Sequence, residues 1–290
     1  MKKFIILLPV YNDWKSASKL LKEIDSKIID WESEVSVLII NDASIEMRSA
    51  MDSYFKKIKS VRVLNMKKNQ GHARCFATGL KFIIERENFD YVILMDADGE
   101  DRPEELNMLF NKLKEYPDKV ITADRVKRSE GPLFKFCYEI HKYLTYIFTG
   151  HLIKFGNYSC LPRDFVVKIT KEPSAWSSFS GSLTKLIPDR ISISSIKGLR
   201  YYGPSKMSFF NLLIHSYSII AVFKKTAFLR SFIFLSVYLL LIFQSLSFVT
   251  LLPVFLIIIL LFAVVWTSKR ENLDQFKKSL DNISNIDNFN

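Results

Sequence analysis

Short apolar segments alternate with longer amphipathic segments along the first part of the chain. Each apolar segment is bounded by polar or turn residues, which predicts strands at 4–10, 35–40, 61–66, 91–95 and 120–123. The segments between them have apolar residues at helical spacing, which predicts helices at 14–29, 45–58, 73–86 and 104–116. This alternation is typical of an α/β domain with a mostly parallel sheet, whose functional groups gather at the carboxyl ends of the strands.

The pattern changes abruptly between positions 228 and 266, where Arg230 is the only charged residue. About 20 apolar residues cross a bilayer core, so this segment predicts two transmembrane helices joined by a turn near 245–253. Basic residues flank the segment on both sides: Lys224, Lys225, Lys269 and Arg270. The positive-inside rule then places both ends in the cytoplasm. A buried helical pair in a soluble protein is the alternative, but its helices would rarely be apolar on every face.

Two further stretches mix aromatic and aliphatic residues with a few polar ones, at 133–155 and 207–223. Either could be a helix lying in the membrane interface, and the first could equally be an amphipathic helix packed on the sheet. The expected organisation is a catalytic domain at 1–205, an interfacial segment at 206–227, two transmembrane helices at 228–267 and a polar cytoplasmic tail at 268–290. The strand and helix pattern ends before position 228, so we expect the catalytic domain to fold without the residues that follow.

Composition narrows the classes of partner. The 290 residues include 41 lysines and arginines against 30 aspartates and glutamates, and the net charge of +11 favours anionic partners such as phospholipid or phosphorylated substrates. Nucleic acid is disfavoured because the aromatic residues lie in apolar stretches rather than beside basic clusters. The three cysteines form no CxxC pair, which argues against a zinc site or a disulfide framework.

An acidic segment, Asp96-Ala97-Asp98-Gly99-Glu100-Asp101, directly follows the fourth predicted strand. Several carboxylates at one strand end repel one another unless a cation is bound, and hard divalent ions prefer oxygen ligands. We therefore predict a Mg²⁺ or Mn²⁺ site. Alternation along an extended segment would put Asp96, Asp98 and Glu100 on one side as metal ligands, with Asp101 facing elsewhere. A solvated acidic loop is the alternative.

Two other polar groups follow predicted strands. Asp42 ends the second strand and would lie at the same edge of the sheet, although it could simply cap a helix. Gly71 precedes the helix predicted at 73–86, and there it could serve turn geometry or allow a phosphate to approach the helix start.

Four motifs in this order resemble those of family 2 glycosyltransferases: Pro9-Val10-Tyr11-Asn12-Asp13, Asn41-Asp42-Ala43-Ser44, Asn69-Gln70-Gly71 through Ala77 and Gly79, and Asp96-Ala97-Asp98. The resemblance covers about the first 125 residues and implies a GT-A fold, which is Rossmann-like, and an inverting transfer from a nucleotide sugar. It also implies a donor-binding set made of Pro9, Tyr11, Asp13, Asp42, Gly71, Arg74 and Ala97. Asp96 and Asp98 would lie around the metal diphosphate.

A later segment, Arg200-Tyr201-Tyr202-Gly203-Pro204-Ser205-Lys206, is similar to one found in polyisoprenyl-phosphate glycosyltransferases, the group that contains dolichol-phosphate mannose synthase. The resemblance implies an acceptor-phosphate site made of Arg125, Arg128, Ser205 and Lys206. The implied catalytic set is Asp96, Asp98, Arg125, Arg200 and Lys206. Three features depart from that group: Glu100 replaces a glutamine, Gly99 replaces an aliphatic residue, and the segment 155–161 around Asn157 differs, which leaves the acceptor open.

The chemistry of the acceptor distinguishes two enzymatic hypotheses. A sugar hydroxyl must lose a proton as it attacks, so it needs a carboxylate base, whereas a lipid phosphate is already anionic and needs cations. The acids between positions 152 and 199 are only Asp164, Glu172 and Asp189, and none belongs to a Glu-Asp pair. This absence favours a phosphate acceptor, although Asp101 could in principle act as a base.

The leading hypothesis is transfer of a hexose from a UDP- or GDP-sugar to a polyisoprenyl phosphate at the cytoplasmic face of a membrane, with a bacterial inner membrane as the expected location. A family 2 enzyme acting on a hydroxyl of a glycolipid or polysaccharide is the first alternative. A non-catalytic nucleotide-sugar-binding membrane protein is the second. The sequence is compatible with a homo-oligomer but does not fix the oligomeric state, the sugar, the base or the lipid length.

Overall fold

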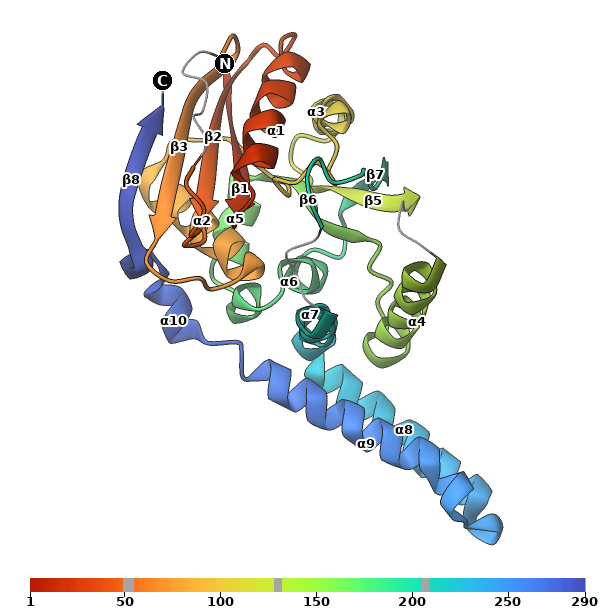
Figure 1. The fold of residues 1–290 in the computed structure, drawn as a ribbon. Coiled ribbons are helices and arrows are strands. Elements are labelled where there is room, and N and C mark those ends of the chain that lie inside the picture. The colour runs from red at the N-terminus through yellow and green to blue at the C-terminus, as the bar shows by residue number, and fades with distance from the viewer. Residues whose placement is uncertain (49–54, 128–131, 205–208, 290) are drawn as a thin grey trace.

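The computed structural model of the chain describes residues 1–48, 55–127, 132–204 and 209–289. A single sheet forms the centre of the α/β part, and two long helices project from it as a hairpin (Figure 1). The strands are β1 Lys2–Val10, β2 Ser33–Asn41, β3 Ile58–Met66, β4 Tyr91–Leu94, β5 Ile121–Lys127, β6 Phe155–Pro162, β7 Ile191–Ile196 and β8 Ile283–Phe289. The α-helices are α1 Trp14–Lys27, α2 His72–Arg86, α3 Leu106–Glu115, α4 Pro132–Thr149, α5 Arg163–Ile169, α6 Phe179–Leu186, α7 Phe209–Val222, α8 Lys224–Ile242, α9 Phe248–Ser268 and α10 Leu273–Lys277. Short 3₁₀ helices are η1 Pro103–Glu105, η2 Pro173–Trp176, η3 Phe243–Ser245 and η4 Ser279–Asn282.

The eight strands of the sheet lie in the order β7-β5-β6-β4-β1-β2-β3-β8. β1 pairs in parallel with both β2 and β4, so Leu7 lies opposite Leu38 on one side and Leu94 on the other. β6 runs antiparallel to β4 and β5, and β8 runs antiparallel to β3. The carboxyl ends of β1, β2 and β4 therefore meet at one edge of the sheet, as the alternating pattern predicted.

The sheet is buried on both faces, which explains why β1 reads as a continuous apolar run. Ile6 and Leu8 lie in a core cluster with residues of α1 and α3, whereas Ile5 and Leu7 lie in a second cluster with residues of α2, α5 and α6. Gly79 of α2 lies directly against the Leu7 side chain, so any larger residue would push the helix away from the sheet.

The predicted strands are present, and the helix predicted at 45–58 is not found in the described part of that range. Residues 49–54 lie outside the described residues, residues 45–48 and 55–57 are not helical, and Ile58 already begins β3. The amide oxygen of Asn12 accepts hydrogen bonds from the backbone N–H groups of Ile45 and Glu46, at 2.9 and 3.2 Å. These bonds hold the start of the segment against the first loop instead of in a helical turn.

The hairpin helices α8 and α9 are both long and apolar enough to cross a membrane, and most of their surface is exposed. Their turn is shorter than predicted, because α9 begins at Phe248 with a capping box formed by Ser247 and Thr250, and Pro253 lies inside the helix. The lone charged residue, Arg230, donates hydrogen bonds to the carbonyls of Tyr146 and Ile147 near the end of α4. Arg230 therefore supplies hydrogen bonds to carbonyl groups at the carboxyl end of α4, which have no partner within the helix.

Helices α4 and α7 lie between the sheet and the hairpin (Figure 1). A small core cluster joins them to it, formed by Phe148 of α4, Ile220 and Ala221 of α7, Ala227 of α8 and Val264 of α9. Apolar side chains of α4 and α7 also remain exposed: Ile140, Tyr143, Tyr146, Ile147, Phe210 and Leu213. Exposed apolar side chains on these helices fit the expectation that they lie in a membrane interface, which stays a prediction.

The segment after the hairpin differs from the expected polar tail, because it folds back onto the α/β domain. Phe276 of α10 is 2% exposed and stacks on Trp176, with ring centroids 5.5 Å apart. β8 then adds an eighth strand beside β3. The sequence concealed this strand because β8 is an edge strand in which exposed polar residues interrupt the apolar ones.

This segment changes what truncation should do. We expect removal of residues 228–290 to destabilise the catalytic domain, because burial of an aromatic side chain such as Phe276 contributes about 3–5 kcal/mol. Replacing only residues 228–267 by a short flexible linker should leave it folded. Such a linker is feasible because the two ends of the hairpin lie close together, with Lys224 Nζ 3.2 Å from Glu271 Oε2.

Thermal unfolding of both proteins, each compared with the full chain, checks this prediction. The linker variant should unfold cooperatively near the full-length midpoint, and the truncated one at a clearly lower temperature or not cooperatively at all. Equal midpoints for the two would show that α10 and β8 contribute nothing to the stability of the domain.

Candidate active site

The acidic segment after β4 forms a turn at the carboxyl edge of the sheet. The chain turns at Ala97 and Asp98, and Gly99 has a φ of 90°, a left-handed conformation that favours glycine. A Cβ atom at Gly99 would also lie 2.7 Å from the Tyr201 ring, so the close approach of that ring again requires glycine. The predicted alternation of side chains assumed an extended segment and therefore does not describe this turn.

Each acidic side chain of this turn is paired with a basic side chain from elsewhere in the chain. The pairs are Asp96 with His72 at 2.8 Å, Asp98 with Arg200, Glu100 with Lys197 at 2.8 Å and Asp101 with Arg125 at 3.1 Å. Arg200 also reaches Asp13 at 2.5 Å, so one guanidinium joins the loop after β1 to the turn after β4. The four cations come from α2, from β5 and from the loop after β7, which the fold brings to one place.

The acidic turn retains strong mutual repulsion despite these cations. Burial, together with the charges of Asp96 and Glu100, raises the pKa of Asp98 to about 6. Burial and the charge of Asp96 raise the pKa of Asp101 to about 7. Burial also opposes ionisation of Asp96, but the charge and hydrogen bond of His72 hold its pKa well below the ordinary value. A further cation would relieve this repulsion, as expected for a site that binds one.

The oxygen ligands of this turn fit Mg²⁺ or Mn²⁺ by their chemistry. Among the residues that the structure describes, however, no group of three or more His, Cys, Asp or Glu side chains is arranged to hold a metal ion. Asp98 and Glu100 face Arg200 and Lys197 instead of each other. Asp96, Asp98 and Glu100 as a metal-binding set therefore remain a prediction.

Asp101 lies inside the cluster, whereas the sequence predicts that it faces elsewhere. Its side chain is 2% exposed, and one carboxylate oxygen accepts a hydrogen bond from the backbone N–H of Asp96 at 2.9 Å. The other oxygen accepts from Arg125. Because both oxygens are engaged, Asp101 holds the turn together and positions Arg125 beside it.

Asp42 connects the end of β2 to the start of α2. Its side chain is 3% exposed and accepts hydrogen bonds from the backbone N–H groups of Gln70 and Gly71, each at 2.8 Å. Burial raises its pKa in spite of these bonds. Gly71 has a φ of 93° and directly precedes α2, so Asp42 fixes a loop whose backbone conformation favours glycine.

The loop after β1 carries the other donor-binding candidates. Tyr11 is 39% exposed and Asn12 has a φ of 49°, which turns the chain toward the loop after β2. The backbone N–H of Asn12 donates to Ser44 Oγ at 2.9 Å. Tyr11 and Asp13 thus lie at the edge of the sheet where the acidic turn also lies.

Three predicted donor-binding residues have a different setting. Pro9 and Ala97 are buried, so only their backbone can face a ligand. The Arg74 guanidinium lies 5.2 Å from the centre of the Trp176 ring, toward η2. Arg128, Ser205 and Lys206 lie outside the described residues, so their roles stay predictions.

Several residues of the site were not predicted. His72 and Lys197 pair with acidic residues of the turn, and the Asn157 side chain of β6 hydrogen-bonds Asp96. The segment around Asn157 departs from the resembled group, and this departure is the sequence feature that could have indicated a special role for Asn157. His72 stood within a motif without an assigned role, and nothing in its spacing pointed to a partner 24 positions away.

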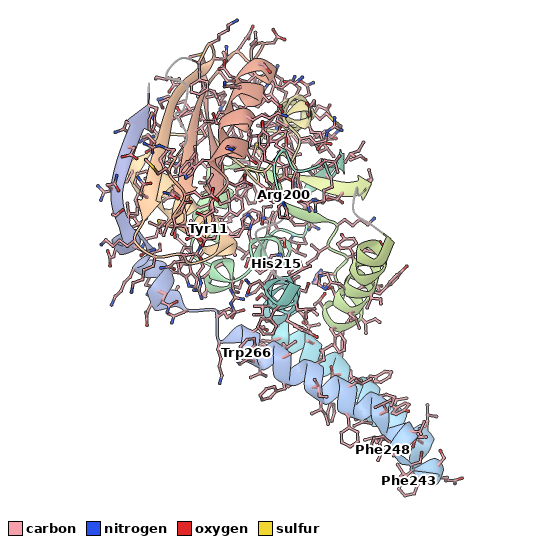
Figure 2. All side chains as sticks on the ribbon, viewed as in Figure 1. Tyr11, Arg200, His215, Phe243, Phe248 and Trp266 are labelled. Atoms are coloured by element: carbon pink, nitrogen blue, oxygen red, sulfur yellow. The ribbon has the colours of Figure 1, made fainter. Side chains whose placement is uncertain are left out.

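His215 of α7 is a further residue that was not predicted, and it faces the site from the side of the hairpin (Figure 2). Burial lowers its pKa to about 4, and the nearby charges that affect this pKa include those of His72, His141 and Asp96. His215 therefore lies within electrostatic range of the acidic turn. The helix that carries His215, α7, also packs on α9 of the hairpin.

A mostly parallel sheet with an acidic turn after the inner strand β4 is typical of GT-A glycosyltransferases. The chain belongs to Glycosyl transferase family 2, whose model matches residues 5–167, more than half of its length. This confirms the resemblance and establishes the protein as a glycosyltransferase.

Two relatives show how far the similarity extends. An undecaprenyl-phosphate 4-deoxy-4-formamido-L-arabinose transferase of Klebsiella pneumoniae is 26% identical over 232 residues, which are 78% of this chain and 69% of that protein. An uncharacterized protein of Methanocaldococcus jannaschii is 26% identical over 113 residues, and this match spans about half of the relative, 47%, and 38% of this chain.

Solved structures confirm the fold. Residues 1–349 of S. aureus TarS superpose with a TM-score of 0.53 at 16% identity, covering 97% of this chain and 89% of that one. Glucosyl-3-phosphoglycerate synthase of Mycobacterium tuberculosis, crystallised with Mn²⁺, UDP-glucose and phosphoglyceric acid, gives 0.52 at 13% identity, covering 78% of this chain and 80% of that one.

Proposed function

We propose that the protein transfers a hexose, with inversion, from a UDP- or GDP-sugar to a polyisoprenyl phosphate at the cytoplasmic face of a membrane. The observation that carries this proposal is that His215 of α7, a helix that packs on the apolar hairpin, lies within electrostatic range of His72 and Asp96 (Figure 2). An acceptor held in a membrane by its lipid could present its head group there. The Klebsiella relative, named as an undecaprenyl-phosphate sugar transferase, supports the same class of acceptor.

The donor would lie across the carboxyl ends of β1, β2 and β4. Tyr11 and Asp13 would contact the nucleotide, and Asp42 would keep the loop before α2 in place through its two backbone hydrogen bonds. Asp96 and Asp98 would face the diphosphate. The mycobacterial structural neighbour was crystallised with Mn²⁺ and UDP-glucose, which supports a divalent ion and a nucleotide-sugar donor.

The cations of the site would control the charge of the reacting groups. Asp96, Asp98 and Glu100 would hold the metal ion, which when bound supplies charge to stabilise the leaving nucleoside diphosphate. Arg200 would exchange its pairing with Asp98 for contacts with phosphate oxygens, which a planar guanidinium binds well. Arg125, held by Asp101, would add a second positive charge, and Lys206 a third, so that an anionic acceptor could approach an anionic donor.

The hydroxyl-acceptor alternative needs a free carboxylate base. Asp101, with a pKa near 7, has the proton affinity of such a base. Both of its oxygens already accept hydrogen bonds, from Asp96 N and Arg125. This pairing favours the phosphate acceptor.

A donor panel tests the proposal. Membranes containing the protein are supplied with radiolabelled UDP- or GDP-sugars and with undecaprenyl or dolichyl phosphate. The expected product is a sugar in an acid-labile, base-stable lipid that forms only when the lipid phosphate is present. Label in a base-labile or polymeric product would instead support a hydroxyl acceptor, and nucleotide binding without any product would support a non-catalytic protein.

Replacement of Lys206 distinguishes the two enzymatic hypotheses. At 4 Å and an effective dielectric constant of 20, a single charge pair contributes roughly 4 kcal/mol before solvation costs. Lys206→Ala should therefore lower turnover with a polyisoprenyl phosphate by about two orders of magnitude, with a smaller effect on nucleoside-diphosphate affinity. Lys206→Arg should restore little activity, because a flat guanidinium does not replace a point charge.

Lys225→Ala is the matched control, because Lys225 is an exposed lysine at the start of α8. A basic residue that only contacts anionic lipid contributes about 1 kcal/mol. Steady-state kinetics should therefore separate the two variants clearly. Near-normal kinetics for Lys206→Ala with a lipid phosphate would favour the hydroxyl acceptor.

A further inference from the structure

A chain of hydrogen bonds connects β8, which follows the hairpin, to the loops after β1 and β2. Asp287 of β8 accepts hydrogen bonds at Oδ2 from Arg48 Nη1 at 2.7 Å and from Asn65 Nδ2 at 2.9 Å. Asn65 Oδ1 in turn accepts from Asn41 Nδ2 at 2.8 Å. Asp287 therefore contacts the loop after β2 directly through Arg48 and, through Asn65, the residue that precedes Asp42.

The same chain continues to the loop after β1. Asn41 Oδ1 accepts a hydrogen bond from the backbone N–H of Ser44 at 3.1 Å, and Ser44 Oγ accepts from the backbone N–H of Asn12 at 2.9 Å. Asn12 lies between Tyr11 and Asp13, the two residues of this loop proposed to contact the nucleotide. Both donor loops are thus linked to one carboxylate on the edge strand.

Arg48 is held in this position by more than its charge pair. Its guanidinium lies 4.6 Å from the centre of the Phe289 ring of β8 and 5.8 Å from that of Trp14, which begins α1. The hydrogen bonds from Arg48 and Asn65 hold the pKa of Asp287 below its ordinary value, so the carboxylate is charged at neutral pH. Asn285 Nδ2 donates to the other carboxylate oxygen of Asp287 at 2.9 Å, which fixes its orientation.

We propose that Asp287 is a positioning residue that holds residues 41–48 and 11–13, the donor loops, in the conformation that binds the nucleotide. The proposal rests on the proposed function, because it takes these loops as part of the donor site. Asp287 does not touch the donor. Asp287 holds the donor loops from β8, a strand that follows the hairpin in the sequence. The segment after the hairpin therefore controls the affinity for the nucleotide.

The test compares three variants of the full chain in detergent. Asp287→Asn keeps the size of the side chain and removes its charge. Arg48→Met removes the hydrogen bond to Asp287 while the sequence of β8 stays unchanged. Asn288→Ala is the matched control, because Asn288 is an exposed neighbour in the same strand. Thermal unfolding first establishes that all three fold.

Hydrogen exchange provides a measurement that needs no donor. In Asp287→Asn and Arg48→Met the amides of Ser44, Ile45 and Glu46 should exchange at least about fivefold faster, because the opening of the loop costs less free energy. Exchange in β1 and β4 should not change. Unaltered exchange at these three amides in both variants would overturn the proposal, whatever the substrate proves to be.

Nucleotide affinity provides the second measurement, with UDP and GDP in the presence of Mn²⁺. Both variants should bind the preferred nucleotide about tenfold more weakly, as is usual when a supporting partner of a binding group is lost. The KM for the sugar donor should rise with them, and kcat at saturating donor should stay the same. The double variant should be no worse than either single one, because both break one link.

The outcomes separate the two proposals. Normal affinity and normal loop exchange in both variants would overturn the role of Asp287, while a wild-type protein that turns over substrate would leave the function intact. A wild-type protein that binds neither nucleotide would contradict the function, and loop exchange would still decide whether Asp287 controls the loops. A general loss of kcat with unchanged KM would also overturn the positioning role.

Discussion

Asp98→Ala is expected to lower turnover by about three orders of magnitude without unfolding the protein, because a metal ion in such a site supplies several kcal/mol of transition-state stabilisation. The change also removes a carboxylate whose neighbours repel it, as the pKa of about 6 for Asp98 indicates. The thermal midpoint should therefore stay the same or rise. Steady-state kinetics of the purified variant, with Mn²⁺ varied up to millimolar concentrations, check the prediction.

Glu104→Ala is the matched control for Asp98→Ala. Glu104 lies six positions further along, its side chain is 45% exposed, and it pairs only loosely with Arg102 at 3.5 Å. Loss of the Glu104 side chain should change turnover little, as is usual for an exposed ion pair.

Wild-type activity should also disappear with EDTA and return with Mg²⁺ or Mn²⁺. Substantial turnover of Asp98→Ala at any Mn²⁺ concentration would contradict the assignment of the acidic turn.

Arg200→Ala is expected to lower turnover by about two orders of magnitude and, at the same time, to strengthen the binding of Mn²⁺ in the absence of donor. The guanidinium pairs with both Asp13 and Asp98, so it competes with a metal ion for Asp98 until a donor arrives. Its removal leaves the turn more negative. Solvent reduces the Coulomb interaction, and we expect about a tenfold gain in Mn²⁺ affinity.

Opposite changes in activity and in metal affinity make this prediction specific. Mn²⁺ binding can be followed by the electron paramagnetic resonance of the free ion. Arg86→Ala serves as the control, because Arg86 is an exposed cation in the last turn of α2. Weaker Mn²⁺ binding by Arg200→Ala would indicate that Arg200 helps to assemble the metal site instead of competing with it.

The sequence predicted β1 to β5, whose apolar runs are bounded by polar or turn residues. It did not predict β6, an interior strand paired with β4 and β5, because glycine and polar residues interrupt its sequence Phe-Gly-Asn-Tyr-Ser-Cys-Leu-Pro. It did not predict β7, whose sequence Ile-Ser-Ile-Ser-Ser-Ile alternates apolar and polar residues but contains many serines. Nor did it predict β8, because exposed polar residues dominate that strand and its pairing with β3 forms only in the folded domain. Edge strands depend on partners distant in the sequence, which local patterns do not encode.

The candidate site shows the same division. The sequence motifs indicated the acidic turn and Arg200, but they could not indicate that the two pair, because Asp98 and Arg200 are 102 positions apart. It placed Asp101 outside the cluster because it assumed an extended backbone where Gly99 introduces a turn. His215 escaped notice because a single histidine in an apolar helix carries no motif, and only the packing of α7 brings it near the sheet.

The position of β8 near the end of the sequence also affects the order in which the protein folds during synthesis. Synthesis proceeds from the amino end, so β3 leaves the ribosome long before β8. Until β8 is made, β3 is an edge strand without its partner. An uncovered edge strand invites pairing with other chains. The hairpin precedes β8 in the sequence, so β8 can close that edge only after the hairpin has been synthesised. With Asp287 of β8 holding the donor loops, the chain would therefore gain its full donor affinity only after the hairpin has been synthesised.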